Sequence, residues 1–185
     1  SDFLGFIKLW RFYDEALIHK KSSRKLAQLC RDNFLSALRM REWRDIHGQL
    51  AVMVKEMGMR PNEIEADYGQ IHRALLTGLL GNVGFKSDAR EYLGARGIKF
   101  SIFPGSVLFK PPQKKTDSPA AEGGIPKWLM AAELTETTRL YGRTLARIEP
   151  DWIEPLAGHL IKRNYFDPHW EKKAARVSAF EKITL

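Results

Sequence analysis

Apolar side chains in the first third of the chain recur every three or four positions, which is the spacing of helices that pack on one face. Residues 1–17, SDFLGFIKLWRFYDEAL, follow this spacing and predict a first helix. A second helical stretch begins near Leu26, either continues or kinks at Asn33, and reaches about Met57. Glycine and proline at 58–62 then end the helical pattern and mark the first candidate boundary.

The pattern changes after a third helical stretch. Residues 64–80 have helical spacing and become almost uniformly apolar, which predicts a helix buried between its neighbours. Beyond it, short aromatic or β-branched runs alternate with glycine, proline and polar residues, as in a small antiparallel sheet or barrel. The predicted strands lie within residues 92–95, 98–103, 128–134, 143–148 and 176–185. A helix at 151–161 interrupts them, and residues 110–126 form a long surface loop. This order predicts an α+β fold.

The helix predicted at 33–57 carries apolar side chains on one face and cations on the other. At about 100° per residue, the apolar face holds a set that we expect to pack into a core: Leu35, Ile46, Leu50, Met53 and Met57. The opposite face gathers three cations: Arg41, Arg44 and Lys55. This basic ridge is either a solvated surface or a face that contacts a phosphate backbone.

Arg39 lies close to the apolar face in the same projection. A charge in such a place needs a partner, because an unpaired buried charge is costly. We expect Arg39 to pair with Glu42, with Asp45 or with an acid elsewhere in the chain.

The charge balance favours a polyanionic partner. The chain has 30 Lys and Arg against 22 Asp and Glu, which gives a net charge of +8. Aromatic side chains are interleaved with cations in the strand region, a combination that single-strand binding surfaces use for backbone contact and base stacking, although aromatic residues in strands also form cores. The cations there are Arg73, Arg90, Arg96, Lys99, Lys110, Lys127, Arg139 and Arg143.

Other chemistry finds little support in the sequence. The chain has no G-x-x-x-x-G-K-[ST] loop, and its nearest imitation, GLLGNVG at 78–84, predicts a helix-ending turn. The histidines lack the close pair spacing of a zinc site, and a lone cysteine, Cys30, fits a reducing cytoplasmic setting. No apolar run approaches the roughly 20 residues of a membrane span. Because the chain starts at Ser1 and stops at Leu185 in a predicted strand, we expect it to be a piece of a longer polypeptide.

The order of several segments carries more information than any one of them. These segments are SDFLGFIKLWRFY, LCRDNFLSALRMREWRDIHGQL, HRALLTGLLGNVG, REYLGARGIKFSIFPGSVLF and PKWLMAAELTETTRLYGRTLARIEPDWIEPLAGH. In this order they resemble, over residues 1 to about 160, the C-terminal accessory region of DEAH-box RNA helicases. The tail NYFDPHWEKKAARVSAFEKITL, with LGARG and FPGS, is similar to the long bacterial members, the HrpA type. Where the family usually has a His-Pro pair, this chain has Phe103 and Pro104, so no role of that histidine is carried over.

The resemblance implies a division into three parts. Residues 1–60 would be the end of the helical ratchet (helicase-associated) domain, residues 61–165 an OB-fold, here an antiparallel barrel with one inserted helix, and residues 166–185 the start of a further bacterial region. The parent would be an enzyme that hydrolyses ATP with Mg²⁺ between two RecA-like motor domains, moves along single-stranded RNA and unwinds duplexes. Those motor domains are not in this sequence, so we expect neither catalytic activity nor a bound cofactor in the chain itself.

Two interpretations of the function remain open. In the first, the chain is an RNA-binding accessory fragment whose candidate contacts are Arg41, Arg44, Arg73, Arg96, Lys99, Ser106 and Lys110. In the second, it is a protein-docking module with little RNA affinity that binds the motor domains of the same polypeptide or a regulatory protein at the OB-fold. A strong salt dependence of RNA binding favours the first, and a large exposed apolar patch beside the basic ridge favours the second. Both place the protein in the cytoplasm without a membrane partner.

Overall fold

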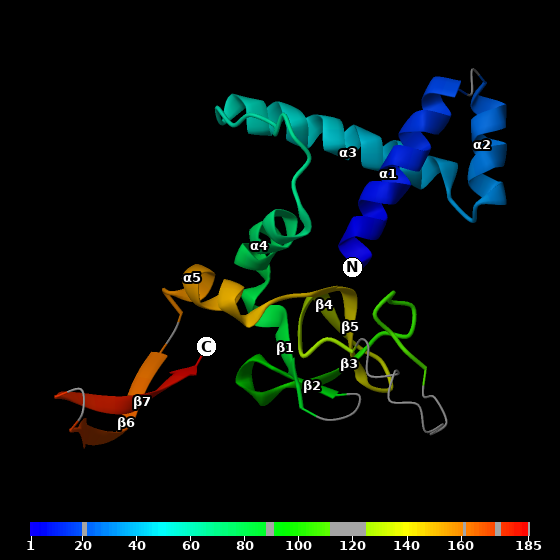
Figure 1. Cartoon of the computed structure of the whole chain (residues 1–185). Coiled ribbons are helices and arrows are strands. Elements are labelled where there is room, and N and C mark those ends of the chain that lie inside the picture. The colour runs from blue at the N-terminus through cyan, green and yellow to red at the C-terminus, as the bar shows by residue number, and fades with distance from the viewer. Residues whose placement is uncertain (20–21, 88–90, 112–124, 161, 173–174, 185) are drawn as a thin grey trace. The chain divides into compact units, whose positions relative to one another are not determined.

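The computed structural model describes two compact units of the chain (Figure 1). One comprises residues 3–67, and the other comprises residues 1–2 together with 68–185. The described residues are 1–19, 22–87, 91–111, 125–160, 162–172 and 175–184. The domain bounds predicted at 60 and 165 stay predictions.

The first unit is a set of helices: α1 (Asp2–His19), α2 (Ser23–Asp32) and α3 (Ala37–Glu56). Their small core consists of the buried side chains of Tyr13, Cys30 and Met40 with half-buried neighbours such as Leu9, Leu26 and Trp43. The second helix ends at Asp32 and does not continue, because Phe34 adopts a left-handed backbone conformation with φ of 58°. Ser36 then caps α3 by accepting a hydrogen bond from the backbone N–H of Arg39.

The apolar face of α3 does not pack as the sequence predicted. Met40 is buried, but the apolar side chains of the following turns are 53 to 67% exposed among the described residues: Ile46, Leu50, Met53 and Met57. The core of this unit closes around the first turns of α3, where α1 and α2 reach it. The expectation of a core-facing stripe along the whole helix is therefore wrong for this chain.

Arg39 pairs with Glu42 at 2.9 Å, one of the partners that the sequence suggested. Its side chain is 80% exposed, so the expected burial is wrong. An exposed pair of this kind adds little to stability.

The second unit contains a closed five-stranded barrel with the strand order β1-β2-β3-β5-β4. The α4 helix (Tyr68–Leu79) and the short η1 helix (Leu80–Asn82) lead into it. The barrel strands are β1 (Val83–Lys86), β2 (Glu91–Gly94), β3 (Lys99–Ile102), β4 (Trp128–Glu136) and β5 (Leu140–Arg147). Helices followed by this OB-like barrel confirm the predicted α+β fold. Neighbouring strands are antiparallel except β3 and β5, which run parallel, so the barrel is mixed.

Three features of this unit differ from the sequence prediction. The first barrel strand, β1, begins in the glycine-containing segment 78–84, for which the sequence predicts only a turn. The predicted strand at 176–185 forms β7 (Arg176–Thr184), which pairs with β6 (Lys162–Glu171) in a separate hairpin and not with the barrel. The predicted helix is short, η4 (Pro150–Trp152) and α5 (Ile153–Ala157), and it follows the last barrel strand.

The interior of the barrel is organised around Phe100. Glycines from three strands face its ring, since a Cβ atom at Gly84, Gly94 or Gly142 would lie 2.5, 3.2 or 2.9 Å from the nearest ring carbon. Tyr92 stacks beside it at 5.9 Å between ring centroids. Because successive side chains of a strand point to opposite faces, an inward Phe100 and Gly142 place Ser101 and Tyr141 on the outside.

Asp2 accepts three hydrogen bonds from two segments of this unit, residues 106–107 and β5. Its carboxylate accepts hydrogen bonds from the Ser106 hydroxyl at 2.6 Å, the Val107 N–H at 2.9 Å and the Leu145 N–H at 2.7 Å. Leu145 is fully buried. β5 pairs with β3 only at Tyr141 and Gly142. The buried Leu145 N–H lies beyond this stretch, so Asp2 supplies the acceptor that a neighbouring strand would otherwise provide.

We predict that Gly84→Ala lowers the free energy of unfolding by about 1–3 kcal/mol, because the added methyl group overpacks the Phe100 ring. The matched control is Gly78→Ala in α4 of the same unit, where a Cβ meets nothing within 4 Å. That substitution should stabilise by roughly 0.5–1 kcal/mol. Urea denaturation followed by circular dichroism measures both, and equal shifts would contradict the packing assigned to Phe100.

We also predict that Asp2→Ala lowers the free energy of unfolding by about 2–4 kcal/mol, since it leaves the donors of Ser106 and Leu145 without an acceptor. Asp2→Asn retains one acceptor oxygen and should cost less. Asp151→Ala, at an exposed position of the same unit, should stay within about 0.5 kcal/mol of the unchanged protein. An Asp2→Ala protein as stable as the Asp151→Ala control would show that the carboxylate does not hold these segments.

Candidate nucleic-acid interface

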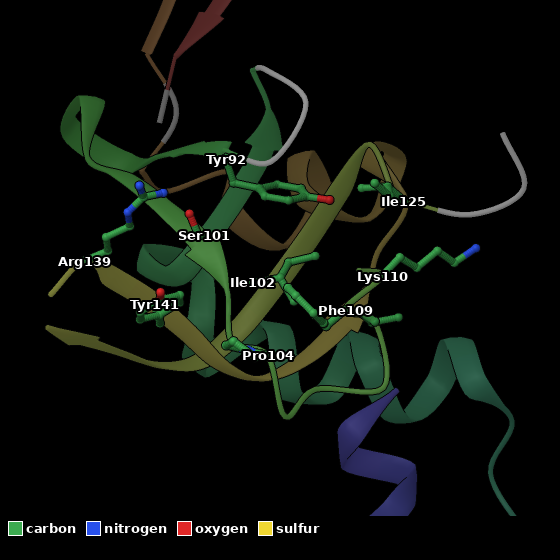
Figure 2. Close-up of a pocket in the computed structure, with 10 residues that line it drawn as sticks. Tyr92, Ser101, Ile102, Pro104, Phe109, Lys110, Ile125, Arg139 and Tyr141 are labelled. Carbon is green, nitrogen blue, oxygen red and sulfur yellow. The ribbon is translucent and has the colours of Figure 1, made fainter. Parts of the chain in front are cut away.

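A pocket of about 210 Å³ opens beside β3 and β5. Its wall is mostly apolar, with Ile102, Leu108 and Phe109 among the lining side chains. Figure 2 shows two cations at its edges, Arg139 on one side and Lys110 on the other. A mostly apolar pocket with a few charged groups at its rim is a common form of ligand site.

Tyr92 forms part of the rigid wall of this pocket. Its hydroxyl donates a hydrogen bond to the carbonyl oxygen of Pro126 at 2.6 Å. Burial raises the pKa of Tyr92 to about 12, because the charged phenolate would lose its hydration. The phenol therefore stays neutral and acts as a structural donor at physiological pH.

The outer face of β3 and β5 presents aromatic rings next to a cation. Phe103 and Tyr141 meet edge to face at 6.0 Å, and the Arg143 guanidinium lies 4.4 Å from the centroid of the Phe103 ring. Arg143 also lies 4.0 Å from Glu133, so part of its charge is balanced. The two rings are half-buried and Arg143 is exposed, and partly accessible rings beside a cation suit base stacking and backbone contact with a single strand.

A second pocket, of about 440 Å³, lies at the start of β4 and the end of β5. It shares Leu108 and Ile125 with the first pocket. Lys127, Trp128 and Arg147 also line it. The two pockets are thus neighbours on one surface of the barrel unit.

Arg44 interacts with residues of its own unit, whereas Arg41 is exposed. Arg44 forms an ion pair with Asp14, and its guanidinium lies 5.4 Å from the centroid of the Trp10 ring. Among the described residues Arg41 forms no salt bridge, although its charge acts on the nearby Tyr13. Of the predicted ridge, Arg41 is the better placed to meet an external phosphate.

Three further candidates lie on the surface of the barrel unit, each with a partner or a constraint. Arg73 in α4 donates to the Gly69 carbonyl and lies 5.8 Å from the Trp152 ring centroid. Arg96 occupies the turn between β2 and β3 with φ of 57° and is exposed. Lys99 lies 3.8 Å from Glu91 on the neighbouring strand.

Ser106 and Lys110 differ sharply in exposure. Ser106 is buried, and its hydroxyl donates to Asp2 while it accepts from the Leu108 N–H at 3.1 Å. This geometry favours a structural role for Ser106. Lys110 is exposed and lines the first pocket, so of the predicted residues it is the one that meets the pocket.

The sequence did not single out several residues that the fold brings to the two pockets. These residues are Ser101, Ile125, Trp128, Tyr141 and Arg147. For Arg139 and Lys127 the sequence indicates only their share in the general basic character of the strand region. The polar run TETTR between two predicted strands signals a hairpin turn, and in OB-folds the loop between the last two strands contacts ligands, so Arg139 was accessible to sequence reasoning.

Other kinds of site find no support in the part of the chain that the structure describes. No three His, Cys, Asp or Glu residues there come together in a way that could hold a metal ion. Burial raises the pKa of the Cys30 thiol, which disfavours its reactive thiolate. None of the described helices combines the length and apolar character that a membrane crossing requires.

Comparisons with known proteins agree with the barrel. A family model described as an oligonucleotide/oligosaccharide-binding (OB)-fold matches residues 71–161. The chain is 50% identical over 186 residues to the ATP-dependent RNA helicase HrpA of Escherichia coli K12, and the match covers 100% of this chain and 13% of that protein. It is 49% identical over 187 residues to the HrpA homolog of Haemophilus influenzae, again with 100% and 13% covered.

A solved structure, the E. coli DExH-box NTPase HrpB, matches 72% of this chain and 15% of that chain at 14% identity, with a TM-score of 0.44. The helicase relatives match at high identity along the whole chain, and the OB-fold model matches the region that forms the barrel. The chain is therefore similar along its whole length to a segment of HrpA-type ATP-dependent RNA helicases that makes up about 13% of their length, and its barrel region matches an OB-fold family.

Proposed function

We propose that this chain is the RNA-binding accessory part of an ATP-dependent RNA helicase. The observation that carries the proposal is the outer face of β3 and β5, where Phe103, Tyr141 and Arg143 lie together. The first pocket, with Lys110 and Arg139 at its rim, provides further cations and apolar surface near Tyr141. Rings for stacking and cations for phosphates suit a single strand of any sequence.

The enzyme's chemistry belongs to the parent polypeptide in this proposal. ATP and Mg²⁺ would be bound by RecA-like motor domains, and the relatives are named as ATP-dependent RNA helicases. The accessory part would guide the single strand that the motor moves, in the cytoplasm. A net charge of +8 supports its attraction to RNA.

The proposed RNA contacts keep most of the residues suggested by the sequence. Arg41, Arg73, Arg96, Lys99 and Lys110 remain candidates because their side chains are exposed. The internal bonds of Ser106 and Arg44 favour structural roles for both. Arg139, Tyr141 and Arg143 join the candidates.

The exposed apolar face of α3 favours a protein contact in the helical unit. Ile46, Leu50 and Met53 are each more than half exposed, and such patches are typical of surfaces that bind protein. We propose that the motor domains or a regulatory protein bind there, while the barrel binds RNA. The two interpretations of the sequence then apply to different units of one chain.

We predict that the chain binds fluorescently labelled single-stranded RNA with a log–log salt slope of about −3 to −4, which corresponds to four to six phosphate contacts. Arg139→Ala should weaken binding and make the slope shallower by about 0.7, because one phosphate contact is lost. Fluorescence anisotropy at several salt concentrations measures both quantities.

The matched control for this titration is Arg31→Ala, which removes another exposed cation, this one from α2. Its affinity and slope should stay those of the unchanged chain. Undetectable binding at low salt, or the same loss from both substitutions, would contradict RNA binding by the barrel face.

We predict that the chain hydrolyses no ATP, with or without RNA, because its sequence contains no phosphate-binding Walker loop. A coupled phosphate-release assay with Mg²⁺ and single-stranded RNA tests this. Turnover above a protein-free blank that persists after repurification would mean that the chain holds a nucleotide site of its own.

A further inference from the structure

The second pocket of the barrel unit has no part in the function proposed above. It lies where β4 begins, at Lys127 and Trp128, and where the chain leaves β5, at residues 147–150. Its volume of about 440 Å³ exceeds the 210 Å³ of the first pocket. A hollow of this size accommodates a planar ring against an aromatic wall.

The second pocket adjoins the first at two side chains, Leu108 and Ile125, which line both pockets. We call these two side chains the partition. The hydrogen bond from the Tyr92 hydroxyl to the Pro126 carbonyl joins the wall of one pocket to that of the other. An extended ligand that crosses the partition meets only apolar side chains at Leu108 and Ile125.

The partition is held in place before any ligand arrives. The Leu108 N–H donates to the Ser106 hydroxyl at 3.1 Å, and that hydroxyl donates in turn to Asp2 at 2.6 Å. The adjacent Val107 N–H also donates to Asp2. Preorganisation of this kind reduces the entropy lost when a flexible ligand binds.

The second pocket offers one stacking ring and one available cation. Trp128 packs against Phe85 at 5.0 Å between ring centroids, which fixes the indole as a platform. Lys127 is exposed and forms no salt bridge with any residue that the structure describes. Arg147 pairs with Glu149 at 2.8 Å, so its charge is already balanced and Glu149 repels phosphate on that side.

We propose that the second pocket continues the RNA path, so that one single strand places a base against Trp128 and a phosphate on Lys127 after crossing the partition from the first pocket. This inference rests on the proposed function, RNA binding by the barrel, because the second pocket alone does not identify its ligand. The charge of Lys127 matches a phosphate, and the ring of Trp128 matches a base of any sequence. The barrel then binds nearby nucleotides of one strand in two adjoining pockets, which meet at Leu108 and Ile125.

The test uses the whole 185-residue chain and a fluorescein-labelled oligouridylate of about eight nucleotides, long enough to reach both pockets. Lys127→Ala should weaken binding and make the salt slope shallower by about 0.7. Trp128→Ala should weaken binding about fivefold or more through lost stacking, and Trp128→Phe should recover most of that loss. Arg139→Ala reports the first pocket in the same titration.

The other possible results distinguish a failure of the second-pocket proposal from a failure of RNA binding by the chain. If the unchanged chain binds and Arg139→Ala weakens binding while Lys127→Ala does not, the second pocket is outside the path and this inference is overturned, though the proposed function stands. If the unchanged chain does not bind RNA, the proposed function itself fails. If an octaglutamate peptide displaces RNA at equal concentration, the second pocket is a site for an acidic protein segment instead. Should Trp128→Ala unfold, the exposed Lys127 decides the question alone.

Discussion

The barrel depends on how closely the Phe100 ring approaches the backbone of three strands. Gly84, Gly94 and Gly142 leave space that any side chain would fill, and the ring occupies it from inside. This packing fixes which residues of β3 and β5 point inward. By the alternation of strand side chains, it also fixes the outward positions of Ser101, Tyr141 and Arg143. The surface proposed for RNA is therefore a consequence of the core.

Asp2 provides the second constraint, and it acts on the segment between β3 and β4. That segment carries Ser106, Val107 and Leu108, and all three are fixed by hydrogen bonds that lead to one carboxylate. Leu108 lines both pockets, so the position of Asp2 sets the wall between them. Asp2 is also the first residue of α1, and the rest of that helix belongs to the other unit. The shape of the two pockets thus depends on a residue about 100 positions away in sequence.

Periodicity predicted most of the elements, because helices and half-buried strands repeat at fixed spacings. It missed β1, whose Gly84 is required by Phe100 and looks like a turn residue. It also missed β6, because Pro168 and the left-handed Asp167 interrupt the strand pattern. The apolar face of α3 was predicted correctly as a pattern, but a pattern does not say whether a partner lies in the same chain. Pairings such as Arg44 with Asp14 and Ser106 with Asp2 join residues far apart in sequence and follow only from the fold.

In the proposed complex, RNA lies on the barrel along the surface of β3, β5 and the two pockets. Hydrogen–deuterium exchange of the whole chain, with and without a saturating oligouridylate, tests it without any substitution. RNA bound on this surface should slow exchange in residues 103–110, 125–129 and 139–147 and leave the second half of α3 unchanged. Protection confined to α3, or none in the barrel while RNA is bound, would contradict it.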